Sequence, residues 1–316
     1  MNPPKLFIVI PCYNEEAALP ITATRLTALT DDMLSKNIIA PQSRIVLVDD
    51  GSRDGTWRVI TDLHERDPRF EGVKLAHNAG HMNALWAGMT LSADRCDCVV
   101  TIDADLQDDV NAMYGFLEEY HSGADVVYGV RSSRKTDTLF KRATARGFYK
   151  LMARMGVELV YDHADYRLLS HRALEALLSF GEVNMFLRGM VPLLGFKTAR
   201  VTYERGERVA GESKYPLRKM LAFAMEGITS FSTQPIRMVL LLGVLCALLG
   251  GVMAVYVIAS IIGGKSVRGW ASTMMSIWLL GGLNLIALGV IGEYVGKIYM
   301  ETKRRPKFIL EEHLTK

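Results

Sequence analysis

The sequence predicts an α/β domain with a mostly parallel, doubly wound sheet, followed by two helices long enough to cross a membrane. Short runs rich in Val and Ile alternate with longer stretches of helical periodicity between residues 1 and 130. Beyond residue 235 the chain becomes densely apolar, although its overall composition, 49% hydrophobic and 22% charged, is ordinary. A chain of 316 residues has room for one folded domain and such an appendage.

The length of each apolar or periodic segment decides whether a strand or a helix is predicted in the α/β part. The strands are predicted from brief apolar runs, as expected where both faces of a sheet are buried. They lie at 6–10, 44–48, 73–75, 98–102 and 125–130. Helices with matching periodicity are predicted at 17–36, 56–66, 82–91 and 110–121. Residues 131–215 are less regular, and 205–215 is predicted to be a loop rich in Gly and charge.

Two later segments are long and apolar. Residues 237–263 and 270–292 contain no charge after Arg237, and each exceeds the roughly 20 residues that cross a hydrocarbon core about 30 Å thick. A pair of buried core helices is the alternative, but Gly-Gly pairs and Trp270 fit a membrane better. The link carries only Lys265 and Arg268, whereas more Lys and Arg flank the outer ends. The positive-inside rule therefore places both termini in the cytoplasm.

The predicted domain plan has four parts. A cytoplasmic α/β domain occupies residues 1–215 and is followed by amphipathic juxtamembrane helices at 216–234. Two transmembrane helices lie within 235–296, at about 237–263 and 270–292, and a cytoplasmic tail follows at 297–316. No signal peptide is recognised in 1–16, which supports the cytoplasmic placement. The amphipathic part equally fits a surface helix of a globular domain. Gly-Gly pairs in the apolar segments predict close helix packing and a homo-oligomer in the cell (inner or plasma) membrane.

Charge and cysteine content argue against two classes of protein. The net charge is +3, and the sequence has no long Lys/Arg tract of the kind that indicates nucleic acid binding. Four cysteines are too few and too scattered for a disulfide framework, so reduced thiols are expected. Cys96 and Cys98 lack a second Cys or His cluster with which to bind a metal.

Asp103-Ala104-Asp105 is the strongest candidate for chemistry. Ligands of doubly wound sheets bind beyond the carboxyl ends of the strands, and this motif directly follows a predicted strand. Its two carboxylates can both face a cleft and bind a hard cation such as Mg²⁺, and Gln107 offers a further oxygen. Such a cation neutralises the charge that develops on a diphosphate leaving group.

Two neighbouring loops are also polar. Asp49-Asp50-Gly51-Ser52 fits a turn that leads to a helix cap at Asp54. It also fits recognition of a base and ribose by carboxylates, and both interpretations can hold together. The loop at 11–15 contains Tyr13, which can stack on a base.

Taken together, these motifs resemble the family 2 glycosyltransferases, which have the GT-A fold. The resemblance rests on PCYNEE at 11–16, VDDGSRDGT at 48–56 and IDADLQD at 102–108. Further blocks resemble the polyprenyl-phosphate glycosyltransferases, most of all the bactoprenol glucosyltransferase and dolichol-phosphate mannose synthase branch. These blocks are VYGVR at 127–131, ADYRL at 164–168, GESKY at 211–215, GITSFS at 227–232 and LGVIGEY at 288–294.

The resemblance implies a substrate pair, a cofactor and a set of site residues. The donor would be a nucleotide-sugar, UDP-glucose before UDP-N-acetylhexosamine or GDP-mannose, and the acceptor polyprenyl (undecaprenyl) phosphate, with Mg²⁺ or Mn²⁺ as cofactor. Nucleotide-sugar contacts are implied at Pro11, Tyr13, Asn14, Glu15, Asp49, Asp50, Asn78 and Asp103. Metal contacts are implied at Asp103, Asp105 and Gln107, acceptor-phosphate contacts at Arg131, Arg142 and Lys214, and catalytic roles at Asp105, Asp165 and Arg167.

Two positions depart from the family pattern. His81 stands where family members often have Lys after Asn-x-Gly, so a diphosphate contact there would depend on protonation of His81. No Gly precedes Asp165, where one is common.

The implied chemistry is an inverting displacement at C1 of the sugar. A phosphate monoester is mostly a dianion at neutral pH and needs no base to remove a proton. The resemblance implies Asp165 as the candidate base, whereas the dianionic acceptor favours a role for it in orienting Arg167 or the sugar. A processive polysaccharide synthase is an alternative, but its Gln-x-x-Arg-Trp motif is absent. A catalytically inactive membrane scaffold is another, disfavoured by the intact acidic motif. The Arg and Lys residues at 131–146 fit either a solvated surface or a contact with anionic lipid.

Overall fold

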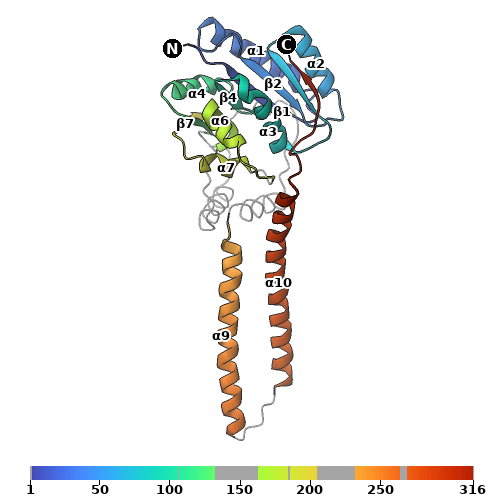
Figure 1. Cartoon of the computed structure of the whole chain (residues 1–316), viewed down its shortest axis with the longest axis vertical. Helices are drawn as coiled ribbons and strands as arrows, with labels where there is room; N and C mark the ends of the chain where they lie inside the picture. Colours follow the sequence, from blue (N-terminus) through green and yellow to red (C-terminus); the bar gives the residue numbers. More distant parts are fainter. Residues whose placement is uncertain are drawn as a thin grey trace. The chain divides into compact units, whose positions relative to one another are not determined.

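The computed structural model describes residues 2–105, 107–131, 163–183, 186–204, 232–263 and 269–315. The chain divides into two compact units (Figure 1). The first is formed by 1–149, 158–216 and 305–316, and the second by 150–157 and 217–304. The first unit is an α/β domain, and the described part of the second is a pair of long helices.

One eight-stranded sheet forms the centre of the first unit, in the order β7-β5-β6-β4-β1-β2-β3-β8. The neighbours among β1 to β4 pair in parallel, and so do β5 and β7, whereas β6 and β8 run antiparallel to their neighbours. The predicted mostly parallel sheet is therefore confirmed. The strands are β1 Leu6–Cys12, β2 Arg44–Asp49, β3 Phe70–Leu75, β4 Cys98–Thr101, β5 Val126–Arg131, β6 His163–Ser170, β7 Thr198–Tyr203 and β8 Leu310–Leu314.

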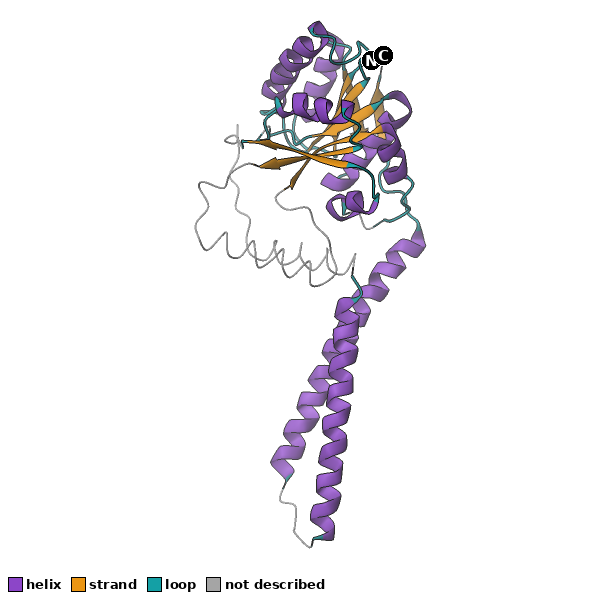
Figure 2. Cartoon of the chain, turned by 90° about the vertical axis from the view of Figure 1, so that its left-hand side faces the viewer, coloured by secondary structure: helices purple, strands orange, loops and turns teal. Residues whose placement is uncertain are grey.

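Helices cover both faces of this sheet (Figure 2). On one face, the main core includes Leu26 of α1, Ile60 of α2 and Phe116 of α4, packed with Ile8 of β1. On the other face α3 packs so closely that a Cβ on Gly88 would lie 2.4 Å from Cγ1 of Val9. The helices are α1 Leu19–Ser35, α2 Thr56–Arg66, α3 His81–Ser92, η1 Ala93–Arg95, α4 Ala112–His121, α6 His171–Leu178 and α7 Leu187–Leu193.

The end of the chain is part of the same sheet. Residues predicted as a tail form β8, which pairs with β3, and the amide of Ala76 donates to the carbonyl of Ile309 at 2.9 Å. Lys74 and Glu311 form an ion pair at 2.7 Å between these strands. Just before β8, the Lys307 ammonium lies 3.5 Å from the ring centroid of Trp86 in α3. Residues 305–315 therefore belong to the α/β domain.

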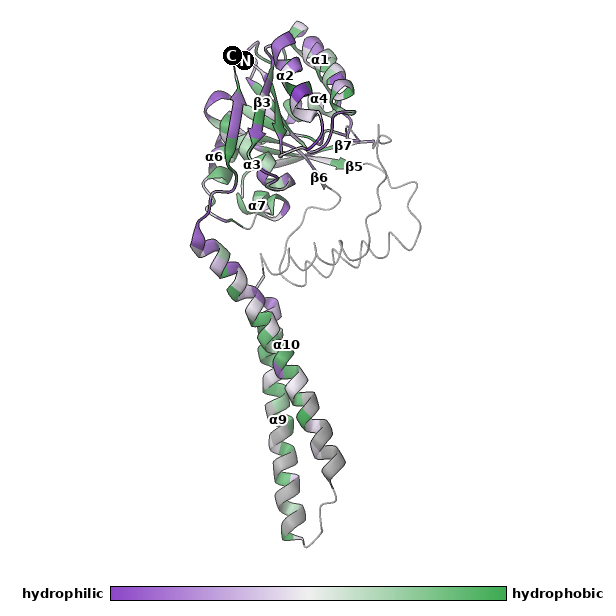
Figure 3. Cartoon of the chain, turned by 90° about the vertical axis from the view of Figure 1, so that its right-hand side faces the viewer, coloured by the Kyte–Doolittle hydropathy of each residue, from purple (hydrophilic) through white to green (hydrophobic). Residues whose placement is uncertain are grey.

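The second unit contains α9, Gln234–Ile262, and α10, Trp270–Lys303. Large apolar side chains along both helices are exposed, and Figure 3 shows hydrophobic residues along their length. Within the described residues, Leu280–Lys303 is the single helical stretch long and apolar enough to cross a membrane, and Gln234–Cys246 is a shorter apolar stretch. The two predicted helices are present, but α10 continues to Lys303, past its predicted end at 292 and into the predicted tail. Two membrane crossings are not established. The predicted juxtamembrane helices at 216–234 lie almost entirely outside the described residues.

The cysteines of the described chain are free, as predicted. Cys12, Cys96 and Cys98 are buried in the α/β domain. Burial raises the pKa of each of these thiols above its ordinary value, so they are kept as neutral thiols at pH 7.

Candidate active site

The acidic motif lies at the carboxyl end of β4, as the sequence predicts. The Thr22 hydroxyl of α1 donates to the carbonyl of Ala104 at 2.7 Å and fixes the middle of the motif. The backbone amide of Gln107 donates to Oδ1 of Asp105 at 3.2 Å. Gln107 itself is buried and lines a cavity of about 600 Å³ beside α1 and α4. The middle of the motif is thus tied to α1, and the backbone that follows it is tied to Asp105.

One carboxylate oxygen of Asp103 is buried and lacks a hydrogen bond from the described residues. This oxygen is Oδ1, and Nε2 of His81 lies 3.5 Å from it. Burial raises the pKa of Asp103 to about 6, while His81 opposes this rise and nearby Asp165 adds to it. An unpaired buried carboxylate oxygen is costly unless a cation or donor satisfies it.

This environment fits a divalent cation. Mg²⁺ commonly takes one or two carboxylates and completes its coordination with water and substrate phosphate oxygens. Asp103 and Asp105 can supply those carboxylates. No group of three or more His, Cys, Asp or Glu suited to a metal occurs in the described parts of the chain. A cation here would therefore depend on the substrate for part of its coordination.

The loop after β1 and the loop after β2 are joined by hydrogen bonds. The amide of Asn14 donates to the Ser52 hydroxyl at 2.9 Å, and the amide of Arg53 donates back to Oδ1 of Asn14 at 2.9 Å. Asn14 has a left-handed backbone (φ 57°), a conformation that Asn tolerates better than most residues. The Glu15 amide donates to Oγ1 of Thr56 at 2.8 Å. The two loops therefore form one rigid surface, from which Tyr13 projects with 43% exposure.

The two predicted nucleotide-binding aspartates of the β2 loop bind backbone amides. Asp49 accepts from the amide of Ser52 at 3.1 Å. Asp50 uses both carboxylate oxygens, accepting from the amides of Ala79 at 2.6 Å and Gly80 at 3.0 Å. Gly80 has φ of 95°, which a side chain would strain. Asp50 thus shapes the loop that leads to His81, and nucleotide contacts at Asp49 and Asp50 stay a prediction.

Asp165, on β6, is held between two arginines. Nη2 of Arg167 donates to its Oδ1 at 2.6 Å, and Arg188 of α7 donates from Nε and Nη2 to the two oxygens at 3.2 and 2.9 Å. Burial would raise the pKa of Asp165, but Arg188 and Arg167 outweigh it and hold that pKa well below its usual range. A carboxylate with so low a pKa is a weak proton acceptor at neutral pH. Its geometry agrees with the prediction that it orients Arg167.

Two residues join this group that the sequence did not assign. Nε2 of His81 lies 3.5 Å from Oδ1 of Asp103 and 3.9 Å from Oδ2 of Asp165, so it stands between the two carboxylates. Its departure from the family pattern was the available signal. Arg188 has only one signal, a single charge among apolar residues of a short helix, and its partner became apparent only in three dimensions.

The remaining predicted residues are more dispersed. Arg131, at the end of β5, donates to Oδ1 of Asp108 from Nε at 3.1 Å and Nη2 at 2.9 Å. The Tyr203 hydroxyl donates to the same oxygen at 2.7 Å. Pro11 is buried at the end of β1, and Asn78 is exposed in the loop that Asp50 holds. The predicted acceptor residues Arg142 and Lys214 lie outside the described residues.

Comparison with known proteins decides the family. The sequence model described as glycosyl transferase family 2 matches residues 7–178, more than half of the chain. The chain belongs to glycosyltransferase family 2. This family 2 enzyme is 51% identical over 308 residues to the uncharacterized glycosyltransferase YkoT of Bacillus subtilis, covering 98% of this chain and 91% of the relative.

More distant relatives have more specific names. The bactoprenol glucosyl transferase of Shigella phage SfV is 36% identical to this glycosyltransferase, and the match covers 99% of this chain and 100% of the relative. The prophage bactoprenol glucosyl transferase homolog of Escherichia coli K12 is 37% identical, and the match covers 97% of this chain and 98% of the relative. Among solved structures, mannosyl-3-phosphoglycerate synthase from Rubrobacter xylanophilus covers 73% of this chain and 75% of its own, with 16% identity. Its TM-score is 0.47.

Proposed function

We propose that this family 2 glycosyltransferase transfers a hexosyl group, glucose in the first instance, from a UDP-sugar to polyprenyl (undecaprenyl) phosphate. The observation that carries this proposal is the alignment of relatives named bactoprenol glucosyl transferase over nearly the whole chain, including the residues of α9 and α10. A likeness restricted to the α/β domain would support only the family. The full-length likeness also supports a lipid acceptor.

The residues at the carboxyl edge of the sheet suit this reaction. Asp103 and Asp105 would hold Mg²⁺ or Mn²⁺, which when bound neutralises charge on the nucleoside diphosphate as it leaves. The joined β1 and β2 loops would hold the nucleotide, with Tyr13 exposed to stack on a base. The arginines beside Asp165 add positive charge near the acidic motif, where phosphate oxygens would gather.

The acceptor would attack without help from a general base. A phosphate monoester is already mostly dianionic at pH 7, so an acceptor oxygen can displace the diphosphate at C1 once the two are aligned. The low pKa of Asp165 agrees with this route, because its arginine partners stabilise the carboxylate and make it a poor base. We assign Asp165 the role of orienting its arginines.

The same proposal includes the cellular setting. The enzyme would be anchored in the cell membrane by α9 and α10, with the α/β domain and both termini in the cytoplasm, where nucleotide-sugars are available. Its exposed apolar helices agree with a bilayer environment. A homo-oligomer of this chain is also part of the proposal, with Gly-Gly pairs such as Gly281-Gly282 as the packing surface.

A transfer assay tests the function directly. Purified full-length enzyme in detergent or vesicles would be given undecaprenyl phosphate and a panel of radiolabelled UDP- and GDP-sugars, with Mg²⁺, Mn²⁺ or EDTA. We expect one donor to yield a lipid-linked monosaccharide, and EDTA to abolish its formation. A lipid-free polymer would favour a processive synthase. No transfer from any donor by folded enzyme would contradict the proposal and favour a scaffold.

A further inference from the structure

Asp108 lies just beyond the acidic motif and is enclosed by the fold. Its side chain has 2% exposure, and its Oδ1 atom accepts every hydrogen bond described next. Arg131 donates from Nε at 3.1 Å and from Nη2 at 2.9 Å, and the Tyr203 hydroxyl donates at 2.7 Å. Removing a buried carboxylate with these partners would leave a guanidinium and a hydroxyl without their acceptor.

Arg131 is the exposed member of this ion pair. Its side chain keeps 30% exposure at the end of β5. β4 and β5 both run antiparallel to β6, which lies between them, so their carboxyl ends reach the same edge of the sheet. Arg131 therefore lies on the edge that carries the acidic motif, two strand spacings or about 10 Å along it. An anion arriving there can reach the guanidinium, whereas the Asp108 carboxylate is covered.

The two bonds to Asp108 fix the direction of the Arg131 guanidinium. This group is a planar fork of N–H donors, in which Nε and Nη2 share one edge. Bound to the carboxylate through that edge, the guanidinium directs Nη1 away from Asp108. A guanidinium that is ordered before its ligand arrives loses less conformational entropy on binding than one that rotates freely.

The loop that carries Asp108 is itself anchored. The Tyr166 hydroxyl of β6 donates to the carbonyl of Asp109 at 3.1 Å. At the start of the loop, the amide of Gln107 donates to Asp105 of the acidic motif. The loop therefore fixes the guanidinium relative to the carboxylates of that motif.

We propose that Asp108 is a positioning residue, which holds Arg131 in the orientation that binds the phosphate monoester of the lipid acceptor. Tyr203 assists by bonding the same carboxylate oxygen. The guanidinium matches phosphate oxygens with paired N–H donors. In this arrangement the donor diphosphate and its cation lie at the end of β4, and the acceptor phosphate lies at the end of β5. The identity of this phosphate rests on the proposed function.

The test is a double-mutant cycle of Asp108→Ala and Arg131→Gln, with Tyr203→Phe as a milder variant that keeps the carboxylate. For each full-length variant, kcat and the KM values for donor and lipid acceptor are measured separately. Binding of UDP and of a short polyprenyl phosphate is measured by calorimetry, and Tm by thermal unfolding.

Asp125→Ala is the matched control. Asp125 is buried at the opposite edge of the sheet, and it also accepts from one arginine, Arg172, and from one hydroxyl, that of Ser170. Its loss should lower Tm, because the hydrogen bonds of a buried carboxylate are lost. Neither KM should change in this control.

We expect Asp108→Ala to raise the acceptor KM, and the dissociation constant of the short polyprenyl phosphate, by roughly tenfold. The donor KM and the binding of UDP should stay unchanged. Tyr203→Phe should raise the acceptor KM by a smaller factor. When Arg131→Gln is already present, Asp108→Ala should cause no further rise, because its effect passes through the guanidinium.

Several results would overturn the inference if the wild type transfers sugar. Asp108 is merely structural if Asp108→Ala lowers Tm while the acceptor KM and the polyprenyl phosphate dissociation constant stay unchanged. The inference is also wrong if the effects of Asp108→Ala and Arg131→Gln add, or if only the donor KM rises. If Asp108→Ala does not fold, an unchanged acceptor KM in Tyr203→Phe overturns it instead.

Failure of the proposed function would look different. If the wild type transfers no sugar but binds the short polyprenyl phosphate, and Asp108→Ala binds it weakly, the inference stands and the proposed function is wrong. If the wild type does not bind the short polyprenyl phosphate, both are wrong.

Discussion

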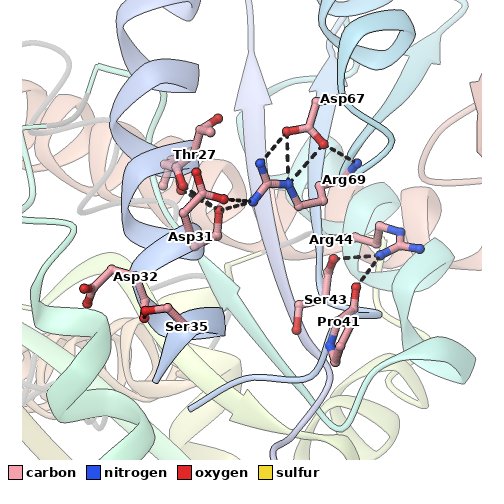
Figure 4. Close-up of polar contacts among 11 residues, drawn as sticks. Thr27, Asp31, Asp32, Ser35, Pro41, Ser43, Arg44, Asp67 and Arg69 are labelled. Carbon is pink, nitrogen blue, oxygen red and sulfur yellow. Dashed lines mark hydrogen bonds and ion pairs between the residues drawn. The ribbon is translucent and has the colours of Figure 1, made fainter. Parts of the chain in front are cut away.

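The two edges of the central sheet use arginine and aspartate in different ways. At the amino edge, Arg69 donates to Asp67 and Asp31, and the close-up in Figure 4 shows its guanidinium between these two carboxylates. Burial opposes ionisation of Asp67, but the hydrogen bonds from Arg69 lower its pKa. Arg172 and Asp125 form a similar closed pair at the same edge. These carboxylates thus have hydrogen-bond donors within the fold.

At the carboxyl edge one carboxylate lacks such a donor. Asp103 keeps a buried oxygen without a donor among the described residues, and its pKa is raised to about 6 by burial. Asp165 lies between Arg167 and Arg188, which both donate to it. A buried oxygen without a donor is costly, and a cation bound there would satisfy it. The two edges therefore differ in whether their aspartates find donors within the described fold, and not in how many charges they carry.

The largest effect is expected at Asp103. Asp103→Asn should lower sugar transfer by about a hundredfold or more, because a carboxylate that would hold the cation is lost. Its Tm should stay nearly the same, since Asp103 Oδ1 has no donor to lose within the described fold. Activity and thermal unfolding measured on the same preparation check both parts. A variant with lower Tm and intact turnover would contradict the comparison.

The next largest effect is expected at Asp165. Asp165→Asn should lower the free energy of unfolding by about 3 kcal/mol, because two arginines then share no buried counter-ion. Transfer of radiolabelled sugar should fall less than in Asp105→Asn, since in the proposed mechanism Asp165 orients its arginines and does not accept a proton. Denaturant titration and the transfer assay measure the two effects. Equal and complete loss of transfer in both variants would favour a general base.

A smaller effect is expected at the amino edge, at Arg69. Arg69→Ala should cost about 1 kcal/mol of stability, because its partners are partly exposed and water replaces the lost hydrogen bonds. The two KM values should not change. Urea unfolding curves compared with the transfer assay test this, and any shift in donor KM would show that the two edges are coupled.

The smallest effect is a difference in pH dependence, at Asp125. Hydrogen bonds from Arg172 lower the pKa of Asp125 in the folded chain, with burial opposing. The stability from this pair is fully present above the unfolded pKa near 3.9 and is lost as the pH falls through the lower folded pKa. Asp125→Asn should therefore show a shallower decline of unfolding free energy below about pH 4. Acid unfolding followed by circular dichroism measures it, and identical slopes would contradict the assignment.

Much of the fold could be predicted because its signals are local. The buried strands of 6–10 and 44–48 occur as β1 and β2, and the helix at 56–66 is found with the same limits in α2. β6 and β7 lie in the less regular part of the sequence, and no strand was predicted there. β8 has only five residues, of which Glu311, Glu312 and His313 are polar, so it has no apolar run to recognise.

Residues of the candidate site could be predicted only where polar side chains directly follow the end of a predicted strand. Asp103 and Asp105 follow a strand directly, so sequence alone places them at the correct edge. Asp50 accepts hydrogen bonds from the amides of Ala79 and Gly80, and Asp165 accepts one from Arg188. In each case the two partners are distant from one another in the chain. Such pairings depend on how helices and loops pack, for which a single sequence carries no pattern.

The position of β8 has a consequence for how the protein is made. The strand that covers the edge of β3 is synthesised only after both long helices. Until then β3 presents a row of unpaired backbone groups, which is a template for unwanted strand pairing. The nascent α/β domain therefore keeps one open edge until the residues beyond α10 have been made.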